Sequence, residues 1–179
     1  SPTSNENWKP IMTETATETR TQQVYRIYIK ATPQAVWDAI TKPEFTAKYG
    51  YTGLVDYELR PGGKYVTRST QEWLDMGMPE VIVDGEVIEA DPPRKLVQTW
   101  RLVMSPEIAA EGFTKLTYEI FETKSAGTRL TVTHDVTHAP ATARMIAGTD
   151  EDETNAGGGW AWILADLKSL LETGSAIAG

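Results

Sequence analysis

The chain alternates apolar and polar residues over several short segments, and this alternation predicts strands. In "TRLTVTHDV" (128–136), Leu130, Val132, His134 and Val136 fall on one side and the intervening polar residues fall on the other. Because a strand has a side-chain period of two, the first set should face a core. The same criterion, with turn-forming residues as boundaries, predicts strands at 24–30, 54–60, 64–70, 80–90, 95–104, 113–122 and 128–136.

Three segments carry helical signals instead. Thr32 and Pro33 are typical of an N-cap and a first helical residue, and they predict a helix over 33–40. A second short helix should begin at Pro43 and run toward Tyr49. The C-terminal segment 160–174 predicts a longer helix that ends at Gly174. Its apolar face consists of Trp160, Ile163, Leu164, Leu167, Leu170 and Leu171.

The two ends of the chain differ from the part between them. The first 22 residues are polar, and threonine recurs at every second position from Thr13 to Thr21, which suits an edge strand or an extended arm. We therefore predict a polar arm over 1–22, one domain over 23–174 and a short tail over 175–179. Trp162 lies about 200° around the last helix from Trp160, so it is either a candidate dock for the arm or a second subunit, or an isolated exposed tryptophan. These two features predict a homodimer.

The order of these elements predicts an α+β fold. Parallel strand pairs need long crossover connections, whereas most of the predicted strands are joined by short turns. We therefore expect a curved antiparallel sheet wrapped around the long C-terminal helix, with two short helices after the first strand. Such an arrangement leaves a space between sheet and helix, where small molecules commonly bind.

Composition narrows the classes of partner. The 179 residues carry a formal net charge of −8, which opposes binding to nucleic acid or to an anionic membrane. The chain has no cysteine, and its two histidines and the acidic run 150–153 do not form a recognisable metal motif. The glycines of "NAGGGW" (155–160) lack the lysine of a phosphate loop. We expect a cytoplasmic protein without a metal ion or a cofactor.

His134 is the most informative candidate for chemistry because it stands in an apolar row. A turn through 123–127 would pair Leu116 with His134 and Tyr118 with Val132, which makes Tyr118 a diagonal neighbour of His134. His134 could orient or react with a ligand, or it could be a core histidine whose ring nitrogens are bonded by the protein.

The predicted ligand site combines these polar groups with apolar and aromatic residues. Each of the latter could instead be part of a solid core, because strand parity near Tyr65 and Trp100 is ambiguous. The candidate lining residues are His134, Tyr118, Trp100, Tyr65, Trp73, Met76, Trp160, Leu116 and Val132.

An ordered set of motifs covers the chain from about Val24 to Gly174: "ATPQAVWDAITKPE", "LRPGGKY", "VIEADPPRKLVQTWR", "GFTKLTYEI", "GTRLTVTH" and "GGGWAWILADLKSLLETG". This set resembles the helix-grip fold of the START and birch-pollen-allergen (SRPBCC) superfamily. Within this superfamily the chain resembles the family similar to the C-terminal domain of the heat-shock-protein ATPase activator. The resemblance implies the fold more strongly than the activity, because the superfamily includes lipid carriers, hormone receptors, polyketide cyclases and hydrolases.

Three functions are consistent with these observations. The first is binding of a small hydrophobic or aromatic ligand in the cavity, as a carrier or sensor. The second is an enzyme of the polyketide cyclase/dehydrase or hydrolase type that uses His134 and Tyr118 as acid and base. The third is a co-chaperone-like ATPase activator. For the third, "NENW" (5–8) is similar to the asparagine-tryptophan motif of true activators, but that motif heads a separate domain, for which some twenty residues leave no room.

Overall fold

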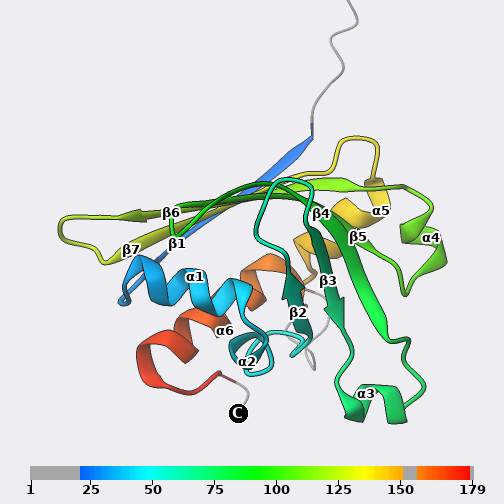
Figure 1. Cartoon of the computed structure of the whole chain (residues 1–179), viewed down its shortest axis with the longest axis horizontal. Helices are drawn as coiled ribbons and strands as arrows, with labels where there is room; N and C mark the ends of the chain where they lie inside the picture. Colours follow the sequence, from blue (N-terminus) through cyan, green and yellow to red (C-terminus); the bar gives the residue numbers. More distant parts are fainter. Residues whose placement is uncertain (1–20, 151–156, 178–179) are drawn as a thin grey trace, which may run out of the picture.

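Seven antiparallel strands form one curved sheet in the computed structural model of the chain, which describes residues 21–150 and 157–177 (Figure 1). The strand order is β1-β7-β6-β5-β4-β3-β2, so β1 and β2 are the two edges. The long helix α6 packs on the inner face of the sheet together with α1. This is the α+β helix-grip fold that the sequence predicts.

The observed elements follow the predicted order, with helix α3, helix α4 and helix α5 in addition. These three helices have five, four and eight residues, too short to show a clear helical period in the sequence. Several strands are also a few residues shorter than predicted. The elements are β1 (Gln22–Ile29), α1 (Pro33–Thr41), α2 (Pro43–Thr46), β2 (Leu54–Tyr57), β3 (Lys64–Arg68), α3 (Gln71–Asp75), β4 (Val81–Asp91), β5 (Lys95–Leu102), α4 (Pro106–Ala109), β6 (Thr114–Glu122), β7 (Thr128–Asp135), α5 (Pro140–Ala147) and α6 (Gly159–Thr173).

Local signals explain the ends of the helices. Thr32 caps α1 by accepting a hydrogen bond from the backbone N–H of Ala35, and Gly174 ends α6 in the left-handed conformation. The N-cap residue of α5, Ala139, makes no side-chain hydrogen bond to the helix. The carboxylate of Glu111 accepts hydrogen bonds from the N–H groups of Ala141 and Thr142 instead. A distant part of the chain therefore supplies this cap.

The hairpin of β6 and β7 has the predicted register. Leu116 pairs with His134, Tyr118 with Val132 and Ile120 with Leu130. Along β7 the residues alternate between buried and half-buried, so the side chains of even number face inward. The core under this hairpin contains Leu116, Leu130 and Val132 from the sheet, Val36 from α1 and Leu167 from α6, among others. Each such aliphatic side chain contributes about 2 kcal/mol through its removal from water.

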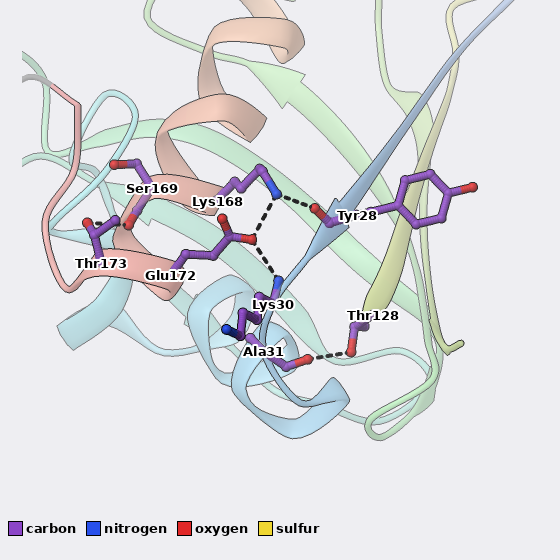
Figure 2. Close-up of polar contacts among 8 residues, drawn as sticks. All are labelled: Tyr28, Lys30, Ala31, Thr128, Lys168, Ser169, Glu172 and Thr173. Carbon is purple, nitrogen blue, oxygen red and sulfur yellow. Dashed lines mark hydrogen bonds and ion pairs between the residues drawn. The ribbon is translucent and has the colours of Figure 1, made fainter. Parts of the chain in front are cut away.

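Polar contacts join helix α6 to the end of edge strand β1 (Figure 2). Lys168 donates to the carbonyl of Tyr28 at 2.6 Å and to the carboxylate of Glu172 at 2.8 Å. That carboxylate also accepts the N–H of Lys30 at 2.7 Å. The hydrogen bond from Lys168, and then the one from Lys30, lower the pKa of Glu172. These contacts fix α6 along the sheet.

A buried carboxylate joins α6 to two segments outside it. Asp166 is 1% exposed, and its two oxygens accept the N–H groups of Gly50 and Ile177, each at 2.7 Å. Hydrogen bonds from two N–H groups are what allow a carboxylate to be buried without a cation beside it. Asp166 thereby holds the segment between α2 and β2 against the helix.

The glycines before α6 serve the chain path rather than a phosphate site. Gly157, Gly158 and Gly159 all have positive φ, at 78°, 67° and 76°, which other residues rarely adopt.

The predicted N-terminal arm lies outside the described residues, apart from its last two positions. None of the helices in the described part of the chain combines the length and apolar character needed to cross a bilayer.

Candidate functional site

A cavity of about 440 Å³ lies between the inner face of the sheet, helix α6 and the segment 47–53. This volume is in the range of small-molecule sites. Five of the seven tyrosines of the chain line it, together with the tryptophans 73, 100 and 160. Its lining contains no aspartate, glutamate, lysine, arginine or histidine from the described residues. The cavity is therefore aromatic and uncharged.

The structure brings five of the predicted site residues to the cavity wall. Trp100, Tyr65, Trp73, Trp160 and Tyr118 all line the cavity.

Four other predicted residues are not in the lining. Met76 is 74% exposed on the turn after α3, whereas Leu116, Val132 and His134 are buried in the core. Strand parity correctly places the last three on the inner face. Strand parity cannot show that helices pack directly on these three residues and leave no cavity there.

His134 lies behind the cavity wall, where both of its ring nitrogens are bonded by the protein. Nδ1 accepts the indole N–H of Trp160 at 3.1 Å, and Nε2 lies 2.7 Å from Oγ1 of Thr114. Its side chain is fully buried. The interpretation of His134 as a satisfied core histidine is thus the one that the geometry supports, and its placement among the cavity-lining residues is corrected.

The partners of His134 determine its tautomer. The indole of Trp160 can only donate, so Nδ1 must be unprotonated and Nε2 must carry the hydrogen. Nε2 then donates to Thr114, whose hydroxyl in turn donates to the carbonyl of Trp100 at 3.0 Å. We call this series from Trp160 through His134 and Thr114 to Trp100 the tryptophan relay. It joins α6 to β7, β6 and β5 and positions the indole of Trp160 in the cavity wall. At its other end the relay bonds the backbone carbonyl of Trp100, whose ring contacts His134 edge to face with the centroids 5.3 Å apart.

Burial lowers the pKa of His134 to about 4, although the nearby Asp135 acts in the opposite direction. The hydrogen bond from Trp160 agrees with this direction, because a proton on Nδ1 would face the indole N–H. His134 is therefore neutral at physiological pH, and its one ring hydrogen is bonded to Thr114.

No hydrogen bond joins Tyr118 to His134, whose two ring nitrogens are bonded to Thr114 and Trp160. The ring of Trp160 makes edge-to-face contacts with both, at centroid distances of 6.0 Å to Tyr118 and 6.1 Å to His134. Burial, and then the phenols of Tyr65 and Tyr49, raise the pKa of Tyr118 well above 10. The predicted acid–base pair is therefore not assembled in this structure.

Three further phenols of the lining are already bonded. Tyr57 donates to Oε1 of Gln98 at 2.6 Å, Tyr49 donates to the carbonyl of Ala39 at 2.8 Å, and the hydroxyl of Tyr65 lies 2.7 Å from that of Thr67. The rings of Tyr57 and Tyr65 stack with their centroids 4.6 Å apart. Burial raises the pKa of Tyr65 to about 12 and the pKa values of Tyr49 and Tyr57 further, so all three stay protonated.

Sequence reasoning missed two buried polar residues that support the site. Gln98 is fully buried and Asp166 is 1% exposed, and each lies within an apolar segment. Both show the signal that singled out His134, namely a polar residue within an apolar run. The sequence offers Trp162 as a candidate dock for the arm or a second subunit. In the structure its ring stacks on that of Tyr51 of the same chain, with the centroids 6.0 Å apart.

Comparisons with known proteins bear on the family and the fold. A sequence model of the family described as "Activator of Hsp90 ATPase homolog 1-like protein" matches residues 30–172. No curated protein matches the chain.

Solved structures similar to this chain include a protein of Mesorhizobium loti, with a TM-score of 0.61, 21% identity, and coverage of 84% of this chain and 96% of that one. A protein of Nitrosomonas europaea has a TM-score of 0.58 at 21% identity, covering 84% and 93%. The Aha1 dimer from Colwellia psychrerythraea has a TM-score of 0.56 at 20% identity, covering 86% and 98%. At such identities the likeness shows the fold alone.

The relay predicts that His134 matters for stability. His134→Leu should leave the indole of Trp160 and the hydroxyl of Thr114 without their partner, at a cost of about 2 kcal/mol and a Tm lower by about 4–8 °C. His134→Gln, which keeps an acceptor and a donor, should lose less. Differential scanning calorimetry measures both. Equal Tm values for wild type and His134→Leu would contradict the role of the relay.

The pKa of His134 predicts a pH dependence of folding. Between the ordinary value of 6.5 and the folded value of about 4, the unfolded chain binds a proton that the folded chain does not. The contribution of His134 to stability is therefore complete above about pH 6.5 and declines by about 3 kcal/mol as the pH falls to about 4. Urea denaturation of wild type and His134→Gln at several pH values isolates the contribution of His134 to the free energy of unfolding. The stability difference between the two proteins should shift in favour of the variant at acidic pH, and a constant difference would contradict the prediction.

Proposed function

The chain belongs to the Activator of Hsp90 ATPase homolog 1-like family, and from this premise we propose that its cavity binds a small hydrophobic or aromatic molecule. The observation that carries the proposal is a cavity of about 440 Å³ lined by tyrosine, tryptophan and aliphatic side chains. A space of this kind favours an apolar occupant, because the occupant and the wall leave water together.

The polar contacts around the cavity favour binding over catalysis. His134 has both ring nitrogens bonded and lies behind Trp160, so it is not placed to reach a ligand. Tyr118 lines the cavity but has no base or acid beside it, and its raised pKa makes it a hydrogen-bonding group near neutral pH. An enzyme of the cyclase or hydrolase type would need other groups to transfer protons.

Filling the cavity should abolish binding. Ile163 of α6 lines the cavity, so Ile163→Trp would place an indole in the space that a ligand needs. We expect phenylnaphthylamine, an uncharged dye whose fluorescence rises in apolar surroundings, to bind the wild type saturably. Its affinity for Ile163→Trp should be at least about tenfold lower, equivalent to about 1.4 kcal/mol.

Ile88→Trp is the matched control, because Ile88 is 46% exposed on β4 and does not line the cavity. This variant should bind the dye as the wild type does, and circular dichroism verifies that both variants are folded. Absence of saturable binding by the folded wild type would refute the proposal. Unchanged affinity of Ile163→Trp for the dye would show that the dye binds outside the cavity.

We also propose a homodimer. The supporting observations are the dimer of the relative from Colwellia psychrerythraea and the alternating threonines of the N-terminal segment. Trp162 no longer supports this proposal, because Tyr51 is its partner. Sedimentation velocity should show a dimer at micromolar concentration and a shift toward monomer when residues 1–20 are deleted. A wild-type monomer under these conditions would contradict the proposal.

A further inference from the structure

We propose that the cavity selects an uncharged ligand with a hydrogen-bond acceptor, such as a ketone or ester carbonyl, and that the hydroxyl of Tyr118 donates to this acceptor. The inference rests on the proposed function, because it names the class of ligand that the same cavity takes. It is carried by two independent features of the lining: the absence of charge and the distribution of free donors.

The lining offers no partner for an ionic group. None of its residues in the described part of the chain carries a charged side chain, so a ligand carboxylate, phosphate or sulfonate would be buried without a counter-ion. Such burial is strongly unfavourable. The nearest buried charge is itself negative, since Asp166 is bonded to Gly50 of the cavity wall and helps to raise the pKa of Tyr49. An anion would therefore be repelled as well as desolvated.

Tyr118 provides the hydrogen bond because the other tyrosines of the lining are bonded to the protein or open to water. Tyr49, Tyr57 and Tyr65 are bonded to the protein as described above. The hydroxyl of Tyr51 accepts the N–H of Gly159 at 3.2 Å and keeps its own hydrogen, but Tyr51 is 55% exposed and can donate this hydrogen to water. Within the described residues the hydroxyl of Tyr118 has no hydrogen-bond partner, although its ring lines the cavity.

Two further unbonded groups of the lining are donors, which argues for an acceptor on the ligand. The indole N–H groups of Trp73 and Trp100, both in the lining, have no hydrogen-bond partner among the described residues, and an indole can only donate. A cationic ligand would leave these two N–H groups without an acceptor, whereas a carbonyl oxygen satisfies one or more donors of the wall.

Two neutral dyes and one anionic dye of similar size test the inference on the intact chain. Phenylnaphthylamine is neutral, anilinonaphthalene sulfonate adds one negative charge to the same rings, and Prodan is a neutral naphthyl ketone. We expect the wild type to bind phenylnaphthylamine at least about tenfold more tightly than the sulfonate, because the cavity cannot compensate the charge.

Prodan reports on the hydrogen bond itself, because its emission moves to the red when its carbonyl accepts one. Tyr118→Phe should weaken Prodan binding about five- to tenfold and move the emission of bound Prodan to the blue. Phenylnaphthylamine has no carbonyl, so the same variant should weaken binding of this dye much less than it weakens binding of Prodan. Tyr28→Phe is the matched control, because Tyr28 is 47% exposed on edge strand β1 and lies outside the lining.

The outcomes separate this inference from the proposed function. Sulfonate binding as tight as that of phenylnaphthylamine, and lost in Ile163→Trp, would overturn the selection against charge while the binding function stands. Unchanged Prodan affinity and emission in Tyr118→Phe would overturn the role of Tyr118. If phenylnaphthylamine itself does not bind the folded wild type, the proposed function has failed and the inference falls with it.

Discussion

The tryptophan relay is the constraint on which the site depends. Apolar packing holds α6 against the sheet but is not directional, whereas the hydrogen bonds from Trp160 through His134 and Thr114 to Trp100 have defined lengths and directions. They set the position of the start of α6 over three strands. Two of the four members also form the wall of the cavity, so the same contacts that stabilise the fold shape the site.

Much of the fold could be predicted from side-chain alternation, because a period of two determines both the strand and the face. The register of β6 and β7 followed from matching apolar residues across one turn. The inward direction of His134 followed in the same way. The structural role of His134 could not be predicted in this way. Strand parity assigns a residue to one face of the sheet but does not tell which helix covers that part of the face. Whether an inward residue meets a helix or a cavity depends on the tertiary packing of α1 and α6.

The polar residues that sequence reasoning missed share one physical property. Gln98, Asp166 and Glu111 each satisfy a group that lies far away in the sequence: the phenol of Tyr57, the N–H of Gly50 and the first turn of α5. Burial of Gln98 and Asp166 is tolerated only because these partners are present. A pattern within one segment can show that a polar residue is out of place, but not which distant group it will meet.

Asp166 gives the cavity wall a mechanical connection to the chain beyond α6. One carboxylate oxygen holds Gly50, a residue of the wall, and the other holds the N–H of Ile177. A single side chain therefore holds both segment 47–53 and the chain after α6, so a substitution at Asp166 would release these two parts of the molecule together.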